Sequence, residues 1–230
     1  MWWKQHKWKV ILPVLIAAVL IFAFWYGGNA PGAKGFVPAA HETASDSNGK
    51  TEESVQTEPP SMEINPETGK DQYLTDPVPE GKPIPVEPQN VTIGTTEHTC
   101  TISISCSTIL DNMDLCDPEK VELVPEDGWI LEPMTVTFYE GESVFNVLQR
   151  TCKQQKIHME FENTPMYNSA YIEGIQNLYE FDVGELSGWM YKVNGWFPNY
   201  GCSRYQLQDG DEVCWVYTCD LGKDVGEVRT

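Results

Sequence analysis

The chain is poor in basic residues, and this shortage excludes one large class of partner. Its 230 residues include 15 Lys and Arg against 34 Asp and Glu, which gives a formal net charge of −19 at pH 7. Nucleic acid carries a phosphate charge at every nucleotide, so a protein this acidic would repel it. The sequence therefore predicts no nucleic-acid partner.

Catalytic and cofactor-binding motifs are also missing. The chain contains neither the G-x-G-x-x-G fingerprint of dinucleotide-binding proteins nor a phosphate-binding P-loop. Residues 184–188 read GELSG, in which the serine stands one place later than in the G-x-S-x-G motif of hydrolases. His158 and Glu160 match half of a zinc-deaminase signature, but no P-C-x-x-C follows them. We therefore expect a non-enzymatic protein without catalytic residues.

No cysteine precedes Cys100, and no two cysteines stand at C-x-x-C spacing. Zinc ribbons and thioredoxin-like sites lack the spacing they need, so we expect no metal site. In an exported domain, disulfide bonds are the natural interpretation, and we expect most cysteines to be paired. The odd number leaves at least one thiol free, and six cysteines alone allow fifteen pairings, so the connectivity stays open. The cysteines are Cys100, Cys106, Cys116, Cys152, Cys202, Cys214 and Cys219.

An apolar run stands near the N-terminus. Residues 10–26 carry no charged side chain and lie at the short end of the lengths that span a bilayer. Lys4, Lys7 and Lys9 precede the run, and acidic residues dominate after it. By the positive-inside rule, residues 1–28 are predicted to form a cytoplasmic stub and a single transmembrane helix in the plasma membrane, with the C-terminal domain extracellular. The alternative is a cleaved signal peptide, whose apolar core is usually only about 7–15 residues long.

Residues 29–96 lack any sustained apolar period and are rich in Pro, Glu, Ser and Thr. A segment of this composition buries too little apolar surface to offset the entropy lost on ordering. We predict a disordered linker that holds the following domain away from the membrane.

Residues 97–226 show sequence patterns that are typical of a folded domain. Alternation of apolar and polar residues predicts strands, and Ser143 is a good N-cap for apolar residues that follow at helical spacing. Strands followed by one helix and further strands predict an α+β domain with a mixed sheet and one main helix. The step from strand through Gly141 into the helix looks β-grasp-like. The predicted strands are 99–105, 135–139, 158–161 and 171–178, and the predicted helix is 143–155.

Aromatic residues crowd the stretch from residue 187 to residue 219. It contains Asn194-Gly195, a strong signal for a β-hairpin turn because both residues tolerate positive φ. Trp215 and Tyr217 alternate within a terminal strand, which favours a place in the core. Trp196 and other aromatics follow the turn beside Pro198 and Gly201, where burial is harder. Whether these loop aromatics bind a ligand or fill the core is left open by the sequence.

Three stretches and their order resemble a known bacterial domain. They are GESVFNVLQR, YNSAYIEGIQNLYEF and GELSGWMYKVNGWFPNYGCSRYQLQDGDEVCWVYTCDLG, within roughly residues 99–226. They look like the domain related to the C-terminal part of transcobalamin and intrinsic factor. In the vertebrate carriers this β-rich domain packs over one face of cobalamin, opposite a helical barrel. The resemblance implies that the aromatic hairpin lies at or near a ligand face.

These observations together predict a membrane-anchored, extracytoplasmic module that binds a ligand. The resemblance makes cobalamin or another corrinoid the first candidate, with no other cofactor implied. The alternative is a cell-surface adhesion module that binds a protein or glycan of the envelope. The predicted ligand-binding residues are Trp189, Tyr191, Asn194, Trp196, Phe197 and Tyr200.

Overall fold

The computed structural model describes residues 62–227. The predicted transmembrane helix and residues 29–61 of the predicted linker lie outside this range. Within residues 62–227, no helix has the length and apolar character needed to cross a bilayer.

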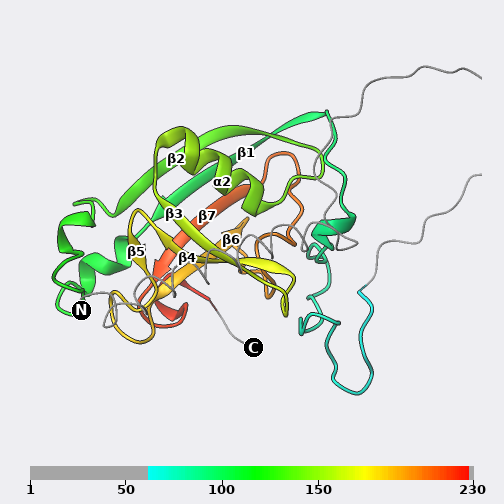
Figure 1. Cartoon of the computed structure of the whole chain (residues 1–230), viewed down its shortest axis with the longest axis horizontal. Coiled ribbons are helices and arrows are strands. Elements are labelled where there is room, and N and C mark those ends of the chain that lie inside the picture. Colours follow the sequence, from blue (N-terminus) through cyan, green and yellow to red (C-terminus); the bar gives the residue numbers. More distant parts are fainter. Residues whose placement is uncertain (1–61, 228–230) are drawn as a thin grey trace, which may run out of the picture. The chain divides into compact units, whose positions relative to one another are not determined.

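A four-stranded mixed sheet forms the centre of the domain (Figure 1). Its strand order is β2-β1-β7-β6, in which β1 (Glu97–Ser105) and β7 (Glu212–Thr218) lie side by side and parallel. The outer strands, β2 (Trp129–Tyr139) and β6 (Gly188–Val193), pair with them in antiparallel register. The first and last strands of the domain therefore pair at the centre of the sheet. This pairing connects the N-terminal and C-terminal parts of the domain.

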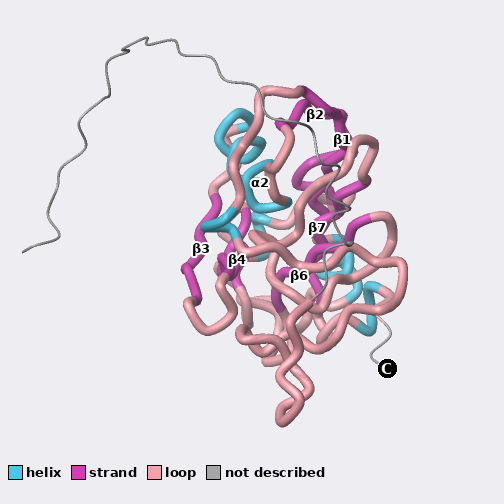
Figure 2. The backbone as a smooth tube through the Cα atoms, turned by 90° about the vertical axis from the view of Figure 1, so that its right-hand side faces the viewer, coloured by secondary structure: helices cyan, strands magenta, loops and turns pink. Residues whose placement is uncertain are grey.

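A second, smaller sheet lies on the other side of the helix. It has the order β3-β4-β5, with β3 (Met159–Thr164), β4 (Ser169–Ile175) and β5 (Leu178–Tyr179) all antiparallel. Helix α2 (Val144–Gln155) lies beside strands of both sheets (Figure 2). Its buried face shares one apolar core with them. Short 3-10 segments occur at Pro88–Asn90, Ser107–Asp111, Val121–Leu123 and Lys223–Val225.

Helix α2 begins and ends for local reasons. The Asn146 N–H donates to the hydroxyl of Ser143, and the Ser143 N–H donates in return to the Asn146 side chain at 2.9 Å, which forms a capping box. Lys156 ends the helix in the left-handed conformation, with φ of 59°. The buried face consists of Val144, Val147, Leu148, Thr151 and Cys152. This confirms the α+β class and the predicted helix.

The described part of the predicted linker is packed against the domain. We call residues 71–93 the strap. Val78 packs against the main core, the Val86 N–H donates to the Arg204 carbonyl at 2.9 Å, and Asp71 and Thr75 are buried. Ordered contacts thus begin well before the predicted domain boundary at residue 97. The composition hides this because the strap is held by a few polar anchors and not by an apolar period.

All seven cysteines are free thiols in the structure, so the predicted disulfide bonds find no support in it. Burial raises the pKa of Cys106 and of Cys152 to about 12, so both are protonated thiols at neutral pH. Cys106 and Cys116 belong to a small core cluster against which Cys219 packs.

We predict that the strap contributes strongly to stability. A chain that starts at residue 97 should lose about 3–5 kcal/mol of unfolding free energy relative to one that starts at residue 62. The buried Arg204 side chain would lose both of its carboxylate partners. Urea denaturation of the two fragments measures this difference, and coincident unfolding curves would contradict the prediction.

Candidate functional site

The predicted ligand-binding residues belong to β6, the turn after it and the loop that follows. Asn194 has φ of 51° and shapes the turn itself. Its side-chain amide donates to Asp211 Oδ1 at 2.7 Å, and its Oδ1 accepts from the Glu212 N–H at 2.9 Å. Because both ends of this side chain are occupied, Asn194 fixes the turn to the start of β7. The turn is closed by the isolated bridge between Val193 and Trp196, and the next strand, β7, begins only at Glu212, so the predicted hairpin reduces to a tight turn after β6.

Tyr191 and Tyr200 are buried, and their hydroxyl groups donate to backbone carbonyls. The Tyr191 hydroxyl donates to the Tyr200 carbonyl at 2.7 Å, and the Tyr200 hydroxyl donates to the Pro83 carbonyl in the strap at 2.6 Å. Burial raises the pKa of Tyr200, which keeps its hydroxyl protonated as a donor. The second contact fixes the strap over the loop.

Trp196 is half-buried within a cluster of aromatic rings. Its ring centroid lies 6.1 Å from that of Tyr200 and 6.5 Å from that of Tyr205. Lys82 of the strap places its ammonium 5.4 Å from the Trp196 ring centroid. We call Tyr191, Trp196, Tyr200 and Tyr205 the aromatic cluster. The strap covers part of this cluster, including Trp196 and Tyr200, which the family resemblance implies lie at or near a ligand face.

Trp189 and Phe197 lie apart from the aromatic cluster. The Trp189 indole N–H donates to the Leu178 carbonyl at 2.8 Å, which links β6 to β5, and its ring packs edge-on against Tyr217. Phe197 is half-buried and lies 5.8 Å from the ammonium of Lys192. The structure thus brings Tyr191, Trp196 and Tyr200 together and leaves the other predicted residues on β6, in the turn after it and in the loop that follows.

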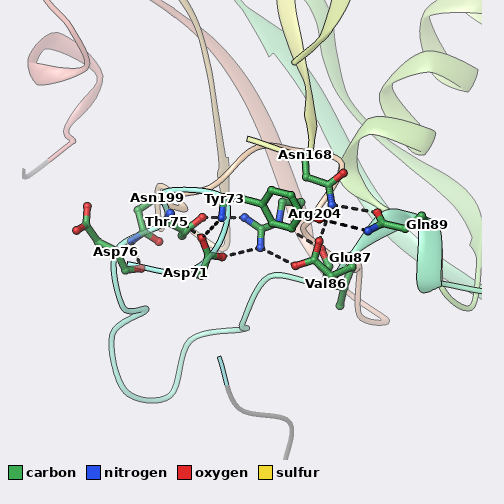
Figure 3. A network of polar contacts seen from close by, with 10 residues as sticks. All are labelled: Asp71, Tyr73, Thr75, Asp76, Val86, Glu87, Gln89, Asn168, Asn199 and Arg204. Atoms are coloured by element: carbon green, nitrogen blue, oxygen red, sulfur yellow. Dashed lines mark hydrogen bonds and ion pairs between the residues drawn. The ribbon is translucent and has the colours of Figure 1, made fainter. Parts of the chain in front are cut away.

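Arg204, which the sequence reasoning missed, is the centre of a buried polar network (Figure 3). Its side chain is only 2% exposed. The guanidinium donates to Asp71 at 2.7 Å, to Glu87 at 3.1 Å and to the Thr75 hydroxyl at 2.7 Å. The Tyr73 ring lies 5.0 Å from it. One buried cation therefore binds both ends of the strap, which no local pattern around Arg204 reveals.

The network continues from the strap to the β3–β4 turn. The Asn168 side-chain amide donates to Glu87 and, at 3.0 Å, to Gln89 (Figure 3). Glu87 is therefore shared between Arg204 and Asn168. This sharing fixes the position of residues 86–93 relative to the turn.

The strap, α2 and the β3–β4 hairpin enclose a groove with a volume of about 550 Å³. No residue of its lining carries a charge, although 21% of the chain is Asp, Glu, Lys or Arg. None of the predicted ligand-binding residues lines it. We call this cavity the groove. Its lining residues are Val86, Pro88, Val91, Ile93, Gly141, Ser143, Phe145, Asn146, Asn163, Thr164, Pro165, Asn168, Ser169, Ala170 and Ser203.

The groove has an apolar wall and a partly unused polar rim. The Phe145 ring packs edge-on against Phe161, with centroids 4.7 Å apart. Ser169 accepts a hydrogen bond from the Ser203 N–H at 3.1 Å, so its hydroxyl is already engaged. The side chains of Asn163 and Thr164 form no hydrogen bond with other residues of the range 62–227. They are available to a ligand.

The described residues contain no group of three or more His, Cys, Asp or Glu side chains placed to hold a metal ion. The lining of the groove offers a ligand apolar contact and neutral hydrogen-bonding groups.

We predict that acid weakens the strap. Burial raises the pKa of Asp71, but hydrogen bonds from Arg204, Thr75 and Tyr73 outweigh this effect and lower it below its ordinary value. A carboxyl group with a lowered pKa stabilises the fold above its unfolded pKa, and this stability is lost as pH falls through the folded pKa. The free energy of unfolding should therefore decrease as the pH is lowered below about 4.

Asp71→Asn should reduce the unfolding free energy by about 2 kcal/mol at pH 7 and flatten this acid-dependent fall. The control is Asp76→Asn, which removes an exposed carboxylate paired with Lys70 at the surface. Urea denaturation between pH 3 and 7 provides the measurement. Identical pH profiles for Asp71→Asn and the unaltered chain would refute the role of Asp71.

Comparisons with known proteins give a matching family and a set of similar solved structures. No curated protein sequence matches the chain. Haptocorrin in complex with Cbi matches in structure with 15% identity and a TM-score of 0.39, over 55% of this chain and 26% of the haptocorrin chain. A "putative metal binding protein from Ruminococcus gnavus ATCC 29149" matches with 12% identity and a TM-score of 0.32, over 53% of this chain and 96% of the other. The chain thus spans about a quarter of the haptocorrin chain. Residues 141–219, from just before α2 to just after β7, match the family described as domain of unknown function DUF4430.

Proposed function

We propose that this chain is a non-enzymatic module that binds a small uncharged molecule in the groove. The observation that carries this proposal is a charge-free lining around about 550 Å³ in a chain of net charge −19. This volume lies within the range of about 300–1,000 Å³ that small-molecule sites occupy. A charged ligand would lose hydration in the groove without meeting a counter-charge, so an uncharged one is favoured.

The arrangement of the lining defines the ligand further. Phe145, Val91 and Ile93 offer an apolar surface. Asn163 and Thr164 offer an amide and a hydroxyl group at one side. A ligand with an apolar face and neutral hydrogen-bonding groups at its edge matches both.

Cobalamin, or another corrinoid, is the first candidate ligand on the strength of the sequence resemblance. Its macrocycle combines an apolar face with peripheral amide groups, which is the chemistry that the groove lining favours. The groove would hold only one side of so large a molecule. The proposal includes a β-grasp-like fold, which is supported by the central parallel pair of β1 and β7 and by α2 following β2 directly.

Titration of the full chain with cyanocobalamin, followed by the absorbance of the cofactor, tests the proposal. Asn163→Asp places a charge in the rim of the groove and should weaken binding at least about tenfold, because the carboxylate loses hydration beside an uncharged ligand. Asn177→Asp makes the same chemical change in the turn between β4 and β5, away from the groove lining, and should leave affinity unchanged.

Two results would count against the proposal in different ways. No saturable binding at millimolar cyanocobalamin would exclude the corrinoid. Equal affinities of the two variants would show that the ligand binds outside the groove.

We further propose that the module is exported and held at the plasma membrane by residues 1–28. The apolar run at residues 10–26, with Lys4, Lys7 and Lys9 before it, supports this proposal. An oxidising compartment would favour a disulfide, and Cys106, Cys116 and Cys219 are the cysteines that meet in the smaller core cluster. Protease added to intact cells should digest the domain, and denatured, unreduced protein should show fewer than seven free thiols. A protected domain with seven free thiols would contradict export.

A further inference from the structure

Several large apolar side chains are exposed beside the start of β6. They border a cavity of about 280 Å³ that lies between the loop after β5 and the loop after β7. Phe181 is 62% exposed and Leu221 is 43% exposed. We call this surface the apolar patch, and it consists of the exposed Tyr171, Phe181, Leu186 and Leu221 together with the half-buried Met190. Grouped apolar side chains at a surface mark sites of interaction more often than scattered ones do.

The backbone at two of these residues is strained. Phe181 has φ of 69° and Leu221 has φ of 49°, both in the left-handed region that glycine favours. Bulky residues rarely adopt this region, and such conformations are often retained at functional sites. Neither side chain is deeply buried, so neither gains much in the fold to offset the strain. Glycine would satisfy the backbone better at both positions.

The loops that carry the patch are held rigidly. The Phe181 N–H donates to the Ser187 carbonyl at 3.2 Å, and the Leu221 N–H donates to the Leu186 carbonyl at 3.0 Å. The buried Ser187 hydroxyl accepts from the Val183 N–H at 3.1 Å. The exposed side chains are therefore presented in fixed positions, which lowers the entropy lost when a partner binds.

The border of the patch is acidic. Glu180 and Glu185 line the cavity, and no Lys, Arg or His does. Asp220 precedes Leu221, and the nearby Lys223 is already paired with Asp220 at 3.2 Å. A partner that complements this border carries basic residues around an apolar contact.

We propose that the apolar patch docks a segment of a partner protein that inserts one or two aliphatic or aromatic side chains between flanking Lys or Arg residues. A second copy of this chain would bring the same acidic border against itself, and an anionic membrane would also be repelled. The cavity at the patch shares no lining residue with the groove. This surface is therefore independent of the function proposed for the groove.

The test uses the full chain in phosphatidylcholine nanodiscs and three fluorescent peptides, with empty nanodiscs as the blank. The probe is Lys-Lys-Leu-Phe-Lys-Lys, and the controls are Glu-Glu-Leu-Phe-Glu-Glu and Lys-Lys-Ser-Ser-Lys-Lys. Fluorescence anisotropy should show that the probe binds at least about tenfold more tightly than either control, and that salt weakens this binding. Equal binding of the serine peptide would overturn the proposal, because charge alone would then explain the affinity.

Variants separate recognition from a structural role. Phe181→Gly and Leu221→Gly should each weaken binding of the probe peptide at least about tenfold. The melting temperature of each variant should stay unchanged or rise, because glycine adopts positive φ freely. Met166→Ser alters a side chain that is 60% exposed at the β3–β4 turn and should change neither quantity. A lower melting temperature with unchanged peptide affinity in both glycine variants would overturn the proposal. So would self-association that both variants abolish, since the occupant would then be a second copy.

Discussion

The structure depends most on the burial of one cation, the Arg204 guanidinium. A buried charge is tolerated only where it is paired and fully hydrogen-bonded. Its partners Asp71, Thr75 and Glu87 all belong to the strap, which lies far away in sequence. The domain therefore needs a segment whose composition resembles a linker, because without it a charge would be buried alone.

The consequences of this constraint reach both candidate ligand surfaces. With its ends bound to Arg204, the strap places Pro83 over Tyr200 and Lys82 over Trp196, so part of the aromatic cluster is covered. The same placement turns residues 86–93 into one wall of the groove. The groove and the covered cluster are two results of one ion-pair network.

The parts of this fold that are encoded locally could be predicted from the sequence. Ser143 and the apolar spacing after it locate α2, and alternation locates β1 and β7. The Arg204–Asp71 contact could not be predicted, because its partners are 133 residues apart and neither belongs to a pattern. The groove was missed for a related reason, since its neutral lining is assembled from segments that are separate in sequence. The aromatic residues were noticed, but only the tertiary structure shows which hydroxyl groups are used within the fold.

The central claim is that the strap is an integral part of the domain and forms the wall of the groove. Amide hydrogen exchange of the full chain, resolved for single residues, tests it most directly. The Val86 N–H, which donates to the Arg204 carbonyl, and the Thr75 N–H, which donates to Asp71, should exchange as slowly as amides of β2. Exchange of these two amides at the rate of an unfolded chain, while the amides of β1 and β7 stay protected, would contradict the account.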